Sequence, residues 1–113
     1  MLRHIEYLTD TIELRFGQSV RYTGRVAHDA TSALLYFVTD EDAEVISVDL
    51  YAYGLSTPQG HIWIKDWSEH AGIANQLVGM EVLEYKATAT VGPFSSPAHL
   101  VKVPDKQSQD EAF

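Results

Sequence analysis

Hydrophobic and polar residues alternate along the first part of the chain, and this pattern predicts β-strands. Residues 11–16 place Ile12, Leu14 and Phe16 on one face and charged side chains on the other. Residues 20–28 alternate in the same way, and Gly17 separates the two runs. A period of two residues is typical of a strand with one buried face. The two runs are therefore predicted to form a hairpin.

Five further strands are predicted along the rest of the chain. Residues 33–38 are apolar on both faces, which is typical of an inner strand that is covered on each side. The others are predicted at 45–53, 61–65, 81–91 and 99–103. In the run 81–91, the alternation places Tyr85 among the inward-facing residues. Loops rich in Gly, Ser, Thr and Pro separate these strands.

One helix is predicted, beginning at Asp66 or Ser68 and continuing to Val78. Asp66 with Glu69 three residues later has the spacing of a capping box, in which both carboxylates bind free backbone N–H groups. Apolar residues then recur at helical spacing, and Gly79 supplies a left-handed stop. His70 is expected to be a partly exposed residue of this helix.

These elements predict an α+β fold. The expected architecture is a strongly curved or partly closed antiparallel sheet of six or seven strands, with the helix 67–78 packed against it. The chain has 113 residues, of which 45% are hydrophobic, enough for one core without disulfides or a metal. Residues 1–103 are expected to form a single domain, and 104–113 a flexible polar tail.

Charge narrows the possible partners. The chain has 16 Asp and Glu residues against eight Lys and Arg, and a formal net charge of −8. Such a surface repels nucleic acid and anionic lipid and favours encounter with basic surfaces. No cysteine occurs, and no apolar run has the length of a membrane span or of a signal peptide core. The protein is therefore expected to be cytoplasmic.

Direct nucleic-acid binding is an alternative function. Three arginines and three tyrosines could line one sheet face as a stacking platform; they are Arg15, Arg21, Arg25, Tyr22, Tyr36 and Tyr53. The net negative charge opposes the counterion release that supplies most non-specific affinity. The arginines are therefore predicted to lie on the solvent side of the hairpin.

The sequence contains only weak signals for a catalytic or metal-binding site. The chain has no Gly-rich phosphate loop, nucleophile elbow, HExxH or calcium-loop spacing. Asp66, Glu69 and His70 could form a small hydrolase or metal site if one helical turn brought them together, but helix capping explains these residue types more simply. The protein is therefore expected to be non-enzymatic, without cofactor or metal.

The candidate binding residues are acidic or aromatic. Four carboxylates lie in the turn 39–44, and the candidates for binding a basic partner are Asp40, Glu41, Asp42, Glu44 and Asp49, with Glu81 and Glu84 as outer candidates. Like charges in a turn are also typical of a solvated hairpin. Trp63 and Trp67 flank the predicted corner between strand and helix, where they are either core residues or a binding hot spot.

One segment resembles a known group of proteins. Residues 62–79 contain Ile62-Trp63-Ile64-Lys65-Asp66-Trp67-Ser68-Glu69-His70-Ala71-Gly72-Ile73. This stretch resembles a segment of small uncharacterised phage, plasmid and conjugative-element proteins, approximately apolar-Ile-Lys-Asp-aromatic-Ser-Glu-Asn-x-Gly. Here His70 replaces the usual Asn, and Ala71 the acidic residue that follows it. The resemblance implies a mobile-element origin and brings no catalytic residues.

The net negative charge, the lack of a catalytic motif and this resemblance together favour a non-enzymatic inhibitor encoded by a phage or plasmid. It is expected to bind a basic nucleic-acid-binding surface of a bacterial defence complex, as an anti-CRISPR or anti-restriction DNA mimic would. The alternative is a structural or accessory module of a mobile element. Such a module would form a homodimer or larger assembly through an edge strand such as 99–103.

Overall fold

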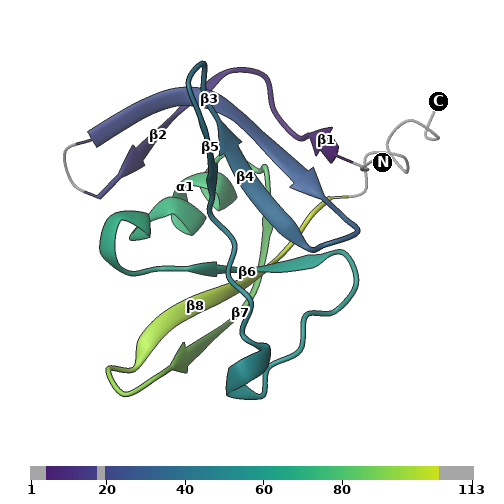
Figure 1. The fold of residues 1–113 in the computed structure, drawn as a ribbon, viewed down its shortest axis with the longest axis vertical. Coiled ribbons are helices and arrows are strands. Elements are labelled where there is room, and N and C mark those ends of the chain that lie inside the picture. The colour runs from purple at the N-terminus through teal and green to yellow at the C-terminus, as the bar shows by residue number, and fades with distance from the viewer. Residues whose placement is uncertain (1–4, 18–19, 105–113) are drawn as a thin grey trace.

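The computed structural model describes residues 5–17 and 20–104 and shows two antiparallel sheets with one α-helix (Figure 1). The predicted α+β class, with curved antiparallel strands and a single helix, is confirmed. Where one sheet of six or seven strands was expected, the described residues form eight strands, which divide between a five-stranded and a three-stranded sheet. Most of the predicted polar tail, residues 105–113, lies outside the described residues.

The first sheet is built around one long strand. Its strands are β1 (Ile5–Tyr7), β2 (Ile12–Phe16), β3 (Val20–Asp29), β4 (Leu34–Val38) and β5 (Ala43–Val45). β2 pairs with the first half of β3 and β1 with the second half, while β4 and then β5 follow on the other side. The predicted hairpin is confirmed, since Phe16 pairs with Val20. β1 has no counterpart among the predicted strands.

The second sheet has the order β6–β8–β7, with β6 at His61–Lys65, β7 at Glu84–Val91 and β8 at Ser96–Lys102. β8 is therefore the inner strand, and the prediction that residues 99–103 form a sheet edge is wrong. In β7 a register shift falls between Tyr85 and Ala87. An extra residue in one strand turns the side chains before it to the other face. Tyr85 is accordingly 51% exposed, and its predicted inward orientation is wrong.

The predicted strand 45–53 is divided, because the chain crosses here from one sheet to the other. β5 ends at Val45; Ile46 N–H then donates to Leu35 O in the first sheet, and Val48 N–H donates to Trp63 O in the second. A 3₁₀ turn, η1 (Tyr51–Tyr53), follows. The Asp49 carboxylate accepts a hydrogen bond from Tyr51 N–H, a local bond that competes with strand pairing.

The helix is shorter than predicted. α1 covers Ile73–Gly79, and a separate 3₁₀ turn, η2 (Ser68–His70), precedes it. Gly72 has φ of 85°, outside the helical region, so it begins the helix instead of continuing it. The residue with positive φ after the helix is Glu81 and not Gly79, as was expected. None of the described helices has the length and apolar character that crossing a membrane needs.

The main core lies where both sheets meet α1. Its fully buried members come from the first sheet, the second sheet and the helix; they include Leu14, Val26, Leu35, Phe37, Ile62, Ile64, Val101, Ile73 and Leu77. A smaller cluster of Leu50, Trp63, Val91 and Ala98 lies on the opposite face of the second sheet. The shared core fixes the two sheets on each other. Within the first sheet, the pairing of β3 with β4 brings the β4–β5 turn beside the β2–β3 hairpin.

Candidate functional site

A cleft of about 420 Å³ lies between the β2–β3 hairpin and the β4–β5 turn. Its lining has two parts, an aromatic part from the hairpin side and an acidic part from the turn. The residues that line it are Phe16, Tyr22, Thr23, Phe37, Thr39, Asp40, Glu41, Asp42 and Glu44. This volume suits one or two side chains of a partner or a small ligand. We call it the acidic cleft.

The aromatic part of the acidic cleft is fixed by mutual ring packing. The Phe16 ring packs edge-on against Tyr22, with centroids 5.4 Å apart, and tilted against Phe37 at 5.7 Å. Phe16 and Phe37 are 7% and 1% exposed, whereas Tyr22 is 49% exposed. The face of an aromatic ring carries negative quadrupole charge and attracts cations. Tyr22 therefore offers the cleft a ring that a cation can reach.

The acidic part is held in place by Thr39. The Thr39 N–H donates to Asp42 O at 2.8 Å, and the Thr39 hydroxyl oxygen accepts hydrogen bonds from the backbone N–H groups of Glu41 and Asp42. All three acidic side chains at positions 40–42 are exposed. Within the described part of the chain, none of them forms an ion pair with Lys or Arg. Their charges are therefore presented to solvent.

Glu44 joins the acidic cleft to the protein interior. Its Oε2 lies 2.9 Å from His70 Nε2, and His70 is only 3% exposed. Because a carboxylate only accepts hydrogen bonds, the His70 Nε2 carries the hydrogen. The expectation that His70 is a partly exposed helix residue is wrong, since it lies in η2 with its ring packed against Phe16 at 5.9 Å. Glu44 is thus less free than its three neighbours to bind a partner.

A second hollow, of about 540 Å³, lies beside α1 and includes Arg15 and Gln76 in its lining. The Gln76 side chain bonds the Arg15 backbone twice, accepting from its N–H at 2.8 Å and donating to its carbonyl at 2.9 Å. The polar groups of the Gln76 side chain thus hold α1 against β2. The acidic cleft is therefore the better candidate for a ligand site.

The other predicted acidic residues do not join the cleft. Asp49 precedes η1 and bonds the Tyr51 backbone, and Glu81 lies in the turn between α1 and β7. Glu84 is on β7, where a hydrogen bond from Lys86 at 3.1 Å lowers the pKa of its carboxyl. The predicted set is therefore dispersed, and the structure brings together only the four carboxylates of the turn.

The two tryptophans differ in environment. Trp63 is 5% exposed and belongs to the smaller core cluster, and its indole N–H donates to Ser56 O at 3.0 Å. Trp67 is partly exposed and packs against the same cluster, with the Lys65 ammonium 5.7 Å from its ring centroid. Trp63 is therefore a core residue, and only Trp67 presents surface to a partner.

The possible hydrolase set is not assembled. His70 pairs with Glu44, whereas Asp66 pairs with His99 at 2.7 Å, and nothing is described of the Glu69 side chain. Asp66 does not cap a helix at positions 67–69 either, because its Oδ1 accepts a hydrogen bond from Gly72 N–H at 2.7 Å. Within residues 5–17 and 20–104, no group of three His, Asp or Glu side chains is placed to hold a metal ion.

The free energy of unfolding depends on pH through the carboxyl group of Asp66. Burial of the carboxyl raises its pKa, but hydrogen bonds from His99 and Gly72 outweigh this, so the pKa lies below the ordinary value of 3.8. A lowered pKa gives stability that is complete above 3.8 and is lost as the pH falls through the folded-state value. Asp66→Asn is expected to lower the free energy of unfolding by about 2 kcal/mol near neutral pH. Urea denaturation should show the difference from wild type shrinking as the pH falls below the ordinary value of 3.8, and a constant difference would contradict the assignment.

Comparisons of the chain with protein-family models, with curated proteins and with solved structures found no match. The aromatic lining of the acidic cleft was missed at the sequence level, although the alternation that places Phe16 and Tyr22 in neighbouring strands was visible. The contribution of Phe37 depends on the pairing of β3 with β4, and the position of His70 depends on its contacts with Phe16 and Glu44. No local pattern reveals either of them. The geometry of the cleft is therefore the basis for a functional proposal.

Proposed function

We propose that this protein binds a basic protein surface through the acidic cleft. The observation that carries the proposal is the meeting of three exposed carboxylates with an accessible tyrosine ring at one hollow of about 420 Å³. A Lys or Arg side chain is the group that such a hollow fits, since carboxylates pair with its charge and the ring of Tyr22 attracts it. Binding of this kind forms and breaks no covalent bond.

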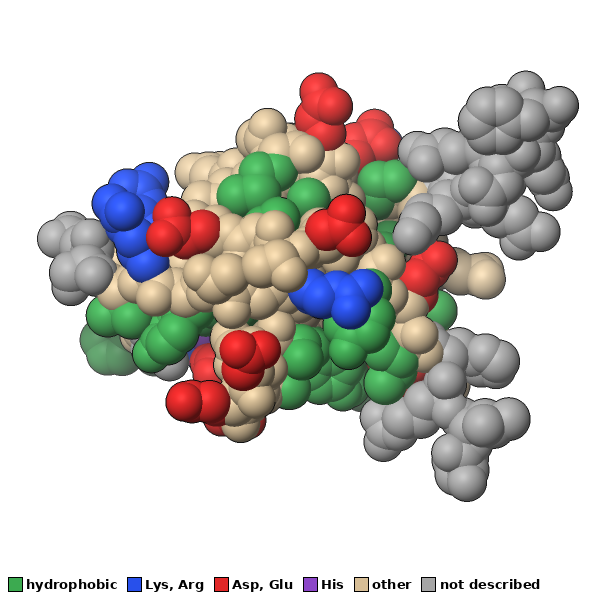
Figure 2. All heavy atoms as spheres, turned by 90° about the horizontal axis from the view of Figure 1, so that it is seen from above, with side chains coloured by type: hydrophobic (Ala, Val, Ile, Leu, Met, Phe, Trp, Pro, Cys, Tyr) green, Lys and Arg blue, Asp and Glu red, His purple; other side chains and the backbone are tan. Residues whose placement is uncertain are grey.

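Charge over the whole molecule supports the same kind of partner. The net charge of −8 is spread widely, and the face in Figure 2 carries Asp and Glu side chains in several places, with Lys and Arg in separate groups. Long-range attraction of this sign raises the rate of encounter with basic proteins. The cleft then supplies the short-range contacts that a diffuse charge lacks.

The partner we propose is the nucleic-acid-binding surface of a bacterial defence complex. Such effectors hold nucleic acid in channels lined by Lys and Arg. A stiff domain with carboxylates on a fixed turn can occupy such a channel in place of phosphates. The resemblance of residues 62–79 to segments of phage and plasmid proteins supports this setting, in which the protein acts as an anti-CRISPR or anti-restriction inhibitor in the host cytoplasm.

The alternative is an assembly module that self-associates. Self-association of this kind requires residues 99–103 to form a free sheet edge. These residues lie mainly in β8, which is the inner strand of its sheet. No observation on the described residues favours this alternative over binding at the cleft. The oligomeric state remains a prediction that sedimentation can measure.

Affinity capture followed by competition tests the proposed function. The tagged chain is used as bait in a bacterial lysate, captured proteins are identified by mass spectrometry, and the binding of each is measured with and without nucleic acid. We expect a nucleic-acid-binding protein whose DNA or RNA competes with the bait. Raising salt from about 50 mM to about 500 mM should weaken binding on the order of 10²-fold, since screening removes the charge attraction.

Two outcomes would contradict the proposal. A captured partner that binds nucleic acid and this chain at the same time would show that no phosphate site is blocked. An affinity unchanged by salt would point to an apolar interface, for which the exposed edge of Trp67 is the candidate. An oligoarginine peptide serves as a defined probe, and it should bind the chain with the same salt dependence.

A further inference from the structure

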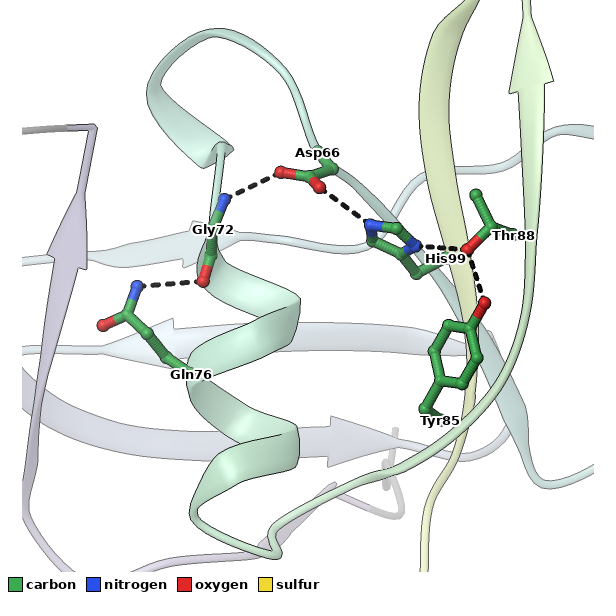
Figure 3. Close-up of polar contacts among 6 residues, drawn as sticks. All are labelled: Asp66, Gly72, Gln76, Tyr85, Thr88 and His99. Atoms are coloured by element: carbon green, nitrogen blue, oxygen red, sulfur yellow. Dashed lines mark hydrogen bonds and ion pairs between the residues drawn. The ribbon is translucent and has the colours of Figure 1, made fainter.

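A chain of four hydrogen-bonded side chains runs across the second sheet beside the start of α1 (Figure 3). Asp66 Oδ2 lies 2.7 Å from His99 Nε2, His99 Nδ1 lies 2.8 Å from Thr88 Oγ1, and Thr88 Oγ1 lies 2.7 Å from the Tyr85 hydroxyl. These residues come from the end of β6, from β8 and from β7. The acidic cleft uses none of them.

The direction of each hydrogen bond follows from the chemistry of its partners. The lowered pKa of Asp66 keeps it ionised at neutral pH, so it accepts and His99 Nε2 donates. In a neutral imidazole the other nitrogen, Nδ1, then accepts the Thr88 hydroxyl proton. The Thr88 oxygen is left to accept from Tyr85. A carboxylate, an imidazole and a hydroxyl in this order are the parts of an activated nucleophile.

The surrounding structure holds this order in place. Gly72 N–H fixes the second oxygen of Asp66, and Asp66 N–H donates to Pro97 O. Thr88 and His99 are directly paired residues of β7 and β8. The register shift between Tyr85 and Ala87 turns the Tyr85 hydroxyl toward Thr88, and such shifts are frequent beside active sites.

The solvent exposure of these side chains also fits a site that reacts with a substrate. The side chains of His99 and Asp66 are 15% and 22% exposed, which shields their hydrogen bond from water. Thr88 itself is exposed, so a substrate can approach its side chain.

We propose that Thr88, His99 and Asp66 form an acyl-transfer site for small carboxylic esters, an activity that goes beyond the proposed binding function. Thr88 is the nucleophile and His99 the general base, while Asp66 is a positioning residue that holds the imidazole in the required tautomer. Tyr85 places its O–H beside the reacting oxygen, where it can donate to the oxyanion that develops on the ester carbonyl.

The reaction balances with water as the only co-reactant. Thr88 Oγ attacks the ester carbonyl carbon while its proton passes to His99 Nδ1, and a tetrahedral oxyanion forms. The carbon–oxygen bond to the leaving group then breaks, and His99 returns the proton to the departing alcohol. Water attacks the acyl-threonine with His99 again as base, which releases the acid and restores Thr88.

A fluorophosphonate probe tests this site, because it reacts by the same attack and leaves a stable adduct. Thr88 Oγ displaces fluoride from phosphorus, and intact mass with peptide mapping locates the adduct. We expect one adduct on Thr88 of the full chain and none on Thr88→Val. Replacing His99 by Gln should slow labelling on the order of 10²-fold. Asp66→Asn should slow it about tenfold, and Asp66→Glu should restore part of the rate.

Two further variants separate chemistry from folding. Thr90→Val changes another exposed threonine of β7 and should leave labelling of Thr88 unchanged. Thr88→Ser keeps the hydroxyl and should remain reactive, which shows that loss in Thr88→Val comes from the missing nucleophile. An unlabelled wild-type chain, or an adduct that persists in Thr88→Val, would overturn the proposal. Neither result would affect binding at the acidic cleft.

Discussion

Gly24→Ala is expected to lower the free energy of unfolding by about 3 kcal/mol or more, because the backbone of β4 leaves no room for a methyl group. A Cβ at this position would lie 2.3 Å from the carbonyl oxygen of Val38 and 3.1 Å from the Phe37 ring. A backbone atom in a paired strand cannot move aside as a flexible side chain can. Domains of this size have total stabilities of about 5–15 kcal/mol, so the loss is a large fraction.

Chemical denaturation followed by tryptophan fluorescence measures the effect, and Gly79→Ala is the matched control. A Cβ at Gly79 meets nothing within 4 Å, and this residue ends α1. Alanine favours helix over glycine by about 0.5–1 kcal/mol, so this variant should be as stable as wild type or slightly more so. Equal stability of the two variants would show that β3 and β4 do not approach closely at Gly24.

Local patterns were sufficient for the strands that stay in one sheet with one buried face. The period of two in residues 11–16 and 20–28 predicted β2, β3 and their hairpin, and the apolar run 33–38 predicted β4 as an inner strand. Burial of a single face determines the pattern of β2 and β3, and a run that is apolar on both faces marked β4. The same physics gave the α+β class.

Local patterns gave wrong predictions where one segment contributes to both sheets, and where a hydrogen bond joins residues that are far apart in the sequence. The alternation over 45–53 reflects buried Ile46 and Leu50, which belong to different core clusters. The predicted capping box failed because Asp66 bonds His99, 33 residues away, and Gly72. Neither partner is marked by a spacing in the sequence. A hydrogen bond of this range depends on the packing of β8 beside β6.

The same division holds for the candidate sites. The acidic side of the cleft was predictable, because four carboxylates in one turn are visible in the sequence. Its aromatic side was not, since Phe37 reaches it only through the pairing of β3 with β4. The hydrogen-bonded chain that includes Thr88 and His99 could not be predicted from the sequence either, because these two residues become neighbours only through the β7–β8 register. The sequence indicates Asp66 as a candidate, but together with Glu69 and His70 instead of His99.

Reversing the charges of the β4–β5 turn is expected to reduce affinity for a basic partner on the order of 10²-fold to 10³-fold. The variant carries Asp40→Lys, Glu41→Lys and Asp42→Lys, each of which changes the charge by two units, so the net charge goes from −8 to −2. Attraction at the cleft is thereby replaced by repulsion, since like charges at an interface cost several kcal/mol. Titration calorimetry with the captured partner and with oligoarginine measures the loss.

The control must carry the same charge change away from the cleft. Asp49→Lys, Glu81→Lys and Glu84→Lys also take the net charge to −2. The two triple variants are matched in one local respect, because each removes a single carboxylate that accepts a backbone N–H: Asp42 from Ala43 in the first, Asp49 from Tyr51 in the second. If the cleft is the binding site, the control should lose only the general attraction, about tenfold at low salt. Equal losses would mean that diffuse charge alone drives binding, and that the aromatic-lined hollow contributes nothing to partner choice.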